Sequence, residues 1–302
     1  MSKVCTFREA ISSIEDGTSV AMGCGLESLI PFAAGYEIIR QKKREVTLIA
    51  PISDIQFDQL IGAGCARKIV AAWVGNVAAG LGHNFRRAME EGIPGPLEVE
   101  EHSNFTIGLG LKAGAMGLPY LPTRTALGSD FSQAPHFSPI TCPFTGENLL
   151  AVRAIVPDVA ILHVQRADKE GNAHLWGNLG VIREAASAAK RVILTCEEVV
   201  DHELILSDPN RTLIPGFLVS HVVHAPFGSH PSPTQGYARR DDDFYFDYHR
   251  QSRSLTGFHE WLQKWVFGVG DHEGYLELLG KERFEKLTPG KEIFSPPVNF
   301  SV

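Results

Sequence analysis

Short apolar runs that alternate with helix-like stretches are the feature that most constrains this 302-residue chain. The apolar runs have the length and the β-branched content of buried strands, whereas the stretches between them repeat with helical period. The runs occupy residues 46–50, 69–74, 159–164, 192–196 and 217–223, and the helix-like stretches occupy 81–91, ended by Gly92, and 181–190. This alternation predicts an α/β fold with a mostly parallel sheet flanked by helices.

The chain is long enough to bury one large core, and we expect a single domain over residues 1–302. A helical extension is predicted at about 255–302, where Phe258, Trp261, Leu262 and Trp265 recur at helical spacing. Such a stripe is typical of core or of an oligomer interface. Two blocks rich in proline or acidic residues, 128–147 and 225–247, interrupt the pattern and are predicted to be irregular.

Composition and charge exclude several classes of protein. A net charge of −7 and a pI near 5.9 argue against a nucleic-acid surface, and the pairs of basic residues, such as Arg239-Arg240, are interpreted as solvated surface. Five cysteines without Cys-x-x-Cys spacing favour the reducing cytoplasm over a disulfide framework or a zinc site. The histidines show no metal-ligand spacing, so no metal site is predicted. Neither a signal region nor an apolar run long enough to span a membrane is present.

A glycine turn, Gly23-Cys24-Gly25, follows the short apolar run 19–22. Glycine tolerates positive φ and lacks a Cβ, so backbone N–H groups in such a turn can converge on an anion or a developing oxyanion. A plain strand-to-loop turn is the alternative. The turn is not a dinucleotide fingerprint, because Ser28 stands where the third glycine would fall.

Motifs spread over nearly the full length resemble the α subunits of class I coenzyme A transferases, and among them the α chain of glutaconate CoA-transferase in particular. These motifs are Gly117-Leu118-Pro119-Tyr120-Leu121-Pro122, Thr195-Cys196-Glu197-Glu198, Ala225-Pro226-Phe227-Gly228-Ser229-His230-Pro231-Ser232 and Trp265-Val266-Phe267. Their collinear order along the chain makes the resemblance specific, although each motif alone is short.

The resemblance implies a heteromeric enzyme, α₂β₂, that moves CoA between an acyl-CoA and a small (di)carboxylic acid. A homologous β subunit would supply the catalytic glutamate, the CoA thioester would be a substrate, and no cofactor would be bound permanently. The glycine turn would help to hold the oxyanion, and here Gly23-Cys24-Gly25 stands where the family has Gly-Gly-Phe. Two alternatives are a CoA-thioester hydrolase, C–C hydrolase or decarboxylase on the same scaffold, and a non-catalytic scaffold subunit.

Other residues are candidates for the site, each with a simpler interpretation. Cys24 could be a reactive thiol or a small pocket-lining residue. Glu101, which ends a predicted strand at 97–101, resembles a general base of the related hydrolases, and its alternative is a solvated strand edge. Gly128 and Ser129 could bind a substrate carboxylate or form a simple turn. Glu147 echoes the family's nucleophile motif, but its context is that of an ordinary turn.

Overall fold

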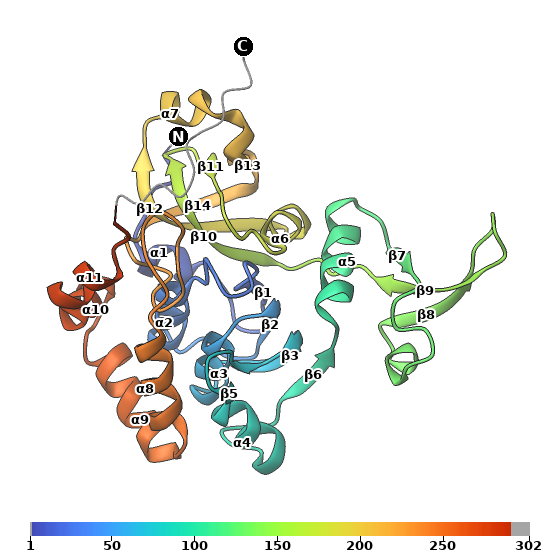
Figure 1. Ribbon diagram of the computed structural model, residues 1–302, viewed down its shortest axis with the longest axis horizontal. Helices are drawn as coiled ribbons and strands as arrows, with labels where there is room; N and C mark the ends of the chain where they lie inside the picture. The colour runs from blue at the N-terminus through green and yellow to red at the C-terminus, as the bar shows by residue number, and fades with distance from the viewer. Residues whose placement is uncertain (1, 291–302) are drawn as a thin grey trace.

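A computed structural model describes residues 2–290 and confirms the α/β fold with a mostly parallel sheet (Figure 1). Seven strands run parallel in the order β14-β12-β10-β1-β2-β3-β6. They are β1 (Ser19–Met22), β2 (Val46–Ile52), β3 (Ala66–Trp73), β6 (Glu98–Glu101), β10 (Val159–Asp168), β12 (Arg191–Val200) and β14 (Val219–His224). The short strands β11 (Ala173–His174) and β13 (Thr212–Ile214) add antiparallel pairs beside β10.

Strand β1 lies where the order of the sheet reverses. It pairs with β2 on one side and with the much later β10 on the other. In open α/β sheets, ligands bind at the carboxyl ends of the strands at such a point. The turn that starts at Gly23 therefore begins at the expected edge of the sheet.

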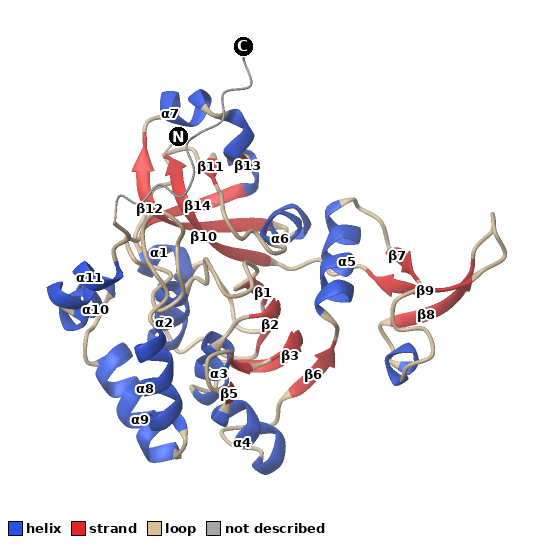
Figure 2. Ribbon diagram, viewed as in Figure 1, coloured by secondary structure: helices blue, strands red, loops and turns tan. Residues whose placement is uncertain are grey.

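Helices cover both faces of the sheet (Figure 2). Because side chains alternate along a strand, Val20 and Met22 pack into one apolar cluster and Ala21 into the other. The first cluster includes residues of α1 (Phe7–Ser12), α2 (Phe32–Arg40), α3 (Ile55–Gly62), α4 (His83–Glu91) and the C-terminal helices, and the second includes residues of α5 (Asn104–Ala115) and α6 (Ile182–Ala188).

The C-terminal helices start earlier than the sequence pattern indicated. They are α8 (Asp242–Ser252), α9 (Leu255–Leu262), a π-helical turn (Gln263–Phe267), α10 (His272–Leu279) and α11 (Lys281–Leu287). The prediction of irregular structure to residue 247 is wrong, because Asp241 caps α8 by accepting a hydrogen bond from the Phe244 N–H. The stripe from Phe258 to Trp265 is buried, which confirms core packing. Residues 291–302 of the expected extension lie outside the described part.

A three-stranded antiparallel sheet projects beyond α5 (Figure 1). Its order is β7-β9-β8, with β7 (Tyr120–Thr123), β8 (Phe137–Thr141) and β9 (Asn148–Arg153). The prediction of a loop over 128–147 is therefore wrong, because β8 and a 3₁₀ turn (Asp130–Gln133) lie inside it. Pro139 obscured the strand pattern, and an edge strand tolerates a proline.

Smaller elements complete the chain. The strands β4 (Gly75–Asn76) and β5 (Gly80–Leu81) form a hairpin, and α7 (His202–Ser207) follows β12. A 3₁₀ turn (Gly216–Leu218) replaces the first residues of the strand predicted at 217–223. Within residues 2–290, no helix is both long and apolar enough to cross a membrane.

Candidate active site

The glycine turn is buried at the carboxyl end of β1. Gly23 has φ +76°, and a Cβ built on it would lie 2.2 Å from Ser53 Oγ, which follows β2. Downstream, the Cys24 carbonyl accepts a hydrogen bond from the Val181 N–H at 2.8 Å. Both the conformation and the space at position 23 therefore require glycine.

The turn presents unpaired backbone donors. In the described part of the chain, the N–H groups of Gly23, Cys24 and Gly25 donate no hydrogen bond to a protein acceptor, although all three residues are buried. Most buried N–H groups in proteins are paired, so three consecutive exceptions indicate that a ligand is their partner. Consecutive amides in a turn of this kind can hold an anion.

The Cys24 side chain does not have the environment of a reactive thiol. It is 1% exposed and packs in the apolar cluster that contains Leu29 and Ile182. Burial raises the pKa of Cys24 to about 12. Because the thiolate is the nucleophile, this environment fits the interpretation of Cys24 as a small packing residue.

A cavity of about 380 Å³ lies against the residues that follow the turn. It is lined by Glu27, Ser28, Leu29, Trp176, Asn178, Pro233, Gln235 and Arg240. Nη2 of Arg240 lies 3.0 Å from Oδ2 of Asp54, and its side chain is only 20% exposed, which corrects its interpretation as solvated surface. The sequence could not reveal this pairing, because 186 positions separate the two residues.

Asp54 has an unusual backbone for a residue other than glycine, with φ +47° directly after β2. Its side chain is buried, and burial raises its pKa while Arg240 opposes that shift. Oδ1 of Asp54 also accepts a hydrogen bond from the Val77 N–H at 3.1 Å. Strained residues of this kind cluster at functional sites, and this one follows the strand beside β1.

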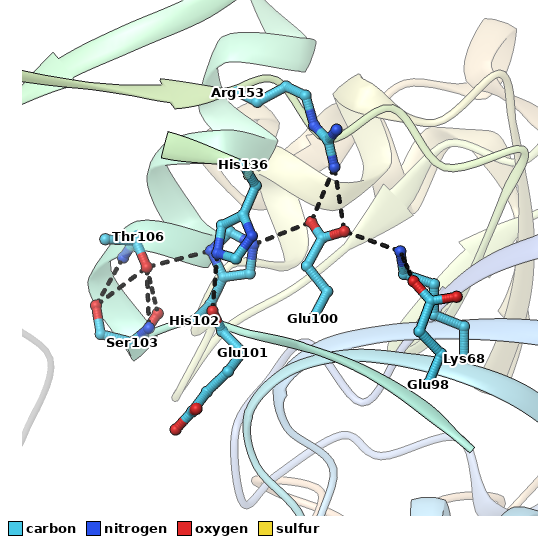
Figure 3. A network of polar contacts seen from close by, with 9 residues as sticks. All are labelled: Lys68, Glu98, Glu100, Glu101, His102, Ser103, Thr106, His136 and Arg153. Atoms are coloured by element: carbon cyan, nitrogen blue, oxygen red, sulfur yellow. Dashed lines mark hydrogen bonds and ion pairs between the residues drawn. The ribbon is translucent and has the colours of Figure 1, made fainter. Parts of the chain in front are cut away.

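Glu100 and Glu101 point to opposite sides of β6, as alternation requires (Figure 3). The Glu101 side chain is exposed, whereas Glu100 lies 3.0 Å from Lys68 Nζ and 3.1 Å from Arg153 Nη2. Hydrogen bonding to His102, followed by Lys68 and Arg153, holds the pKa of Glu100 well below its usual range. Glu101 is thus the free carboxylate at this strand end, and its role as a base stays a prediction.

Gly128 and Ser129 lie between β7 and the 3₁₀ turn of the projecting sheet. Gly128 has φ +78°, and Ser129 Oγ donates to the Ala126 carbonyl at 2.8 Å. Among residues 2–290, no hydrogen bond joins this turn to Gly23–Gly25. Within a single chain the two segments are therefore separate parts of any site, and substrate binding by Ser129 stays a prediction.

Glu147 lies in the turn between β8 and β9. Both of its carboxylate oxygens lie 2.7 Å from Arg124 Nη2, at an exposed position. This environment fits an ordinary turn residue.

Glu197 forms a buried pair with His163 on the neighbouring strand. His163 Nε2 lies 3.0 Å from Glu197 Oε1, and its Nδ1 lies 2.9 Å from Thr195 Oγ1. The other oxygen of Glu197 accepts a hydrogen bond from the Phe227 N–H at 2.7 Å. The carboxylate thus ties β10 and β12 to the loop after β14, which is a structural role.

Three comparisons with known proteins agree with this architecture. The family model described as coenzyme A transferase matches residues 4–225. The chain is 44% identical over 274 residues to the A chain of 3-oxoadipate CoA-transferase from Pseudomonas knackmussii, covering 90% of this chain and 96% of that one. It is 33% identical over 311 residues to the A chain of glutaconate CoA-transferase from Acidaminococcus fermentans, with 96% of each chain covered.

Solved structures give the same result. The crystal structure of the Acidaminococcus glutaconate CoA-transferase superposes with a TM-score of 0.90 at 32% identity, covering 96% of each chain. A variant of the decarboxylase AibA/AibB superposes with a TM-score of 0.74 at 30% identity, over 87% of this chain and all of the other.

The fold, with its unpaired amides at the switch point, is thus that of a coenzyme A transferase, and the chain belongs to this family. Within the family it corresponds to the first of the two kinds of polypeptide, the α type. The decarboxylase or hydrolase alternative is not favoured, because the transferase relatives match at higher identity or higher TM-score.

Proposed function

We propose that this chain is the α subunit of an α₂β₂ CoA-transferase that exchanges CoA between small dicarboxylic acids, and that it contributes Gly23–Gly25 as oxyanion donors. The three consecutive buried N–H groups without a protein acceptor carry this proposal. The substrate class is supported by the names of two relatives, since 3-oxoadipate and glutaconate are both dicarboxylates.

The nucleophile in this proposal is a glutamate of the homologous β subunit. Its carboxylate attacks the thioester carbonyl and expels CoA thiolate, which leaves a mixed anhydride. The thiolate then attacks the glutamyl carbonyl, releases the donor acid as a carboxylate and forms a glutamyl-CoA thioester. The acceptor acid reverses these steps and leaves as its own CoA thioester.

The amides of the glycine turn would act where charge develops. Each attack on a carbonyl creates an oxyanion, and prearranged N–H donors in a water-poor site stabilise it. Gly25 in place of the family's aromatic residue leaves room beside the turn for the reacting groups. CoA enters only as a thioester substrate, so the reaction needs no permanently bound cofactor. Five free cysteines fit a cytoplasmic enzyme.

The test is to purify the chain together with its β partner, and to supply succinyl-CoA with 3-oxoadipate or glutaconate as acceptor. Formation of the acceptor's CoA thioester, with succinate released in equal amount, is the expected result. A complex that forms no new thioester with any small dicarboxylate, or a chain that performs the exchange without a partner, would contradict the proposal.

A further inference from the structure

Glu100, His102 and His136 gather three metal-ligating side chains at the junction between β6 and the projecting sheet (Figure 3). Glu100 and His102 come from the end of β6, and His136 comes from the segment before β8. One donor atom of each lies within 4.8 Å of the others. The two imidazole rings face each other with centroids 4.3 Å apart, and the two histidines are 2% and 4% exposed.

The second nitrogen of each ring has a partner that fixes the ring. His136 Nε2 lies 2.9 Å from the Glu101 carbonyl oxygen, which can only accept a hydrogen bond. His136 Nδ1 therefore carries the free lone pair in the neutral ring. His102 Nδ1 lies 3.2 Å from Thr106 Oγ1 while its Nε2 faces Glu100 at 3.3 Å. Metal-binding histidines are held in this way, with the outer nitrogen bonded to a carbonyl or another polar group.

We propose that Glu100, His102 and His136 bind one divalent first-row transition ion, with Zn²⁺ as the best match. Two imidazole nitrogens and one carboxylate oxygen are a ligand set that Zn²⁺ accepts at about 2.0–2.2 Å. The donor atoms must move closer together than they are here, and Glu100 must loosen its contacts with Arg153. A cavity of about 240 Å³ lined by His136 and Arg153 gives the ion a way in.

The ion would fasten the projecting antiparallel sheet to the main sheet. His136 precedes β8 directly, and Glu100 pairs in register with Val70 of β3. Within the described residues, the Arg153–Glu100 pair joins β9 to β6 in the same place. The role of the ion is thus structural, and it is independent of the CoA-transfer proposal.

The experiment uses the full chain after removal of metal with a chelator. Co²⁺ is titrated and followed by its visible absorption, and Zn²⁺ is then added as a competitor. One Co²⁺ per chain, displaced by Zn²⁺ and accompanied by a higher Tm, is expected. His136→Gln and His102→Gln should each weaken binding at least tenfold. His249→Gln is the matched control, because His249 stacks on His83 at 4.4 Å in a similar histidine pair.

Arg153→Gln protects the test from misfolded variants. Removing the guanidinium that competes for Glu100 should tighten Co²⁺ binding, and misfolding cannot produce that result. The proposal is overturned if the unaltered chain binds no Co²⁺ or Zn²⁺ at this ratio. Binding that His136→Gln leaves unchanged, or that Arg153→Gln weakens, would equally overturn it.

Discussion

Gly23 and Ser53 approach so closely that a Cβ on Gly23 would meet Ser53 Oγ at 2.2 Å. The two residues follow the neighbouring parallel strands β1 and β2, so the contact sets the position of the glycine turn against the sheet. The φ of +76° at Gly23 also disfavours any larger residue. The turn is therefore held in one conformation by both backbone and packing.

Gly23→Ala is expected to lower kcat of the α/β complex by about two to three powers of ten, the usual cost of losing an oxyanion donor. Gly17→Ala is the matched control. Gly17 has φ +81°, but a Cβ there would meet nothing within 4 Å. The control should cost stability and leave kcat unchanged. If both variants lose activity equally, backbone strain explains the effect and the oxyanion role is wrong.

Cys24→Ala should leave CoA transfer close to its original rate, because the buried thiol has a pKa of about 12 and stays protonated. Alkylation by iodoacetamide at about pH 8, near the ordinary thiol pKa, should instead favour Cys142, whose pKa is lowered by hydrogen bonds from Thr145 and Phe144. Peptide mass spectrometry measures the order of labelling. Labelling of Cys24 as fast as Cys142 would show that the thiol is reactive.

His272 should make the protein less stable in mild acid. Burial lowers its pKa to about 4 from an ordinary value of 6.5, so the unfolded chain binds the proton more readily. Its contribution is complete above about pH 6.5 and is lost as the pH falls toward about 4, by up to about 3 kcal/mol. Urea unfolding at about pH 7 and about pH 4.5 measures this change. A His272→Gln variant should show a smaller difference, and an identical difference would contradict the assignment.

Asp241 should be essential for the packing of the C-terminal helices. It lies 2.8 Å from His230 Nε2 and 2.5 Å from Arg283 Nε, with its side chain only 4% exposed. Asp241→Asn leaves the Arg283 charge without its partner and should lower the free energy of unfolding by about 3–5 kcal/mol. Asp243→Asn, at an exposed pair with Lys286, should change it little. Equal effects would show that burial of the pair does not matter.

The sequence was sufficient for the parallel sheet but not for its attachments. The runs at 46–50 and 159–164 are long and apolar because both faces of their strands are covered, so they could be predicted. Strand β8 is an edge strand with a proline and half-exposed side chains, and it carries no comparable signal. Similarly, the acidic run at 241–243 was interpreted as irregular although it starts a helix.

The candidate site could be predicted only in part for the same reason. Gly23–Gly25 could be found from a local pattern of strand and glycine. Arg240 reaches Asp54 across the fold, and His136 reaches Glu100 and His102 from distant positions along the chain. Such contacts depend on how the chain packs, and no spacing along the sequence records them.

The central claim is that this chain stabilises oxyanions while its partner supplies the nucleophile. The most direct measurement is the intact mass of both chains after the α/β complex is incubated with an acyl-CoA and no acceptor acid. The account predicts a mass increase equal to a CoA thioester only on the β polypeptide, without continuing release of free CoA. A CoA adduct on this chain, or steady CoA release without an acceptor, would contradict it.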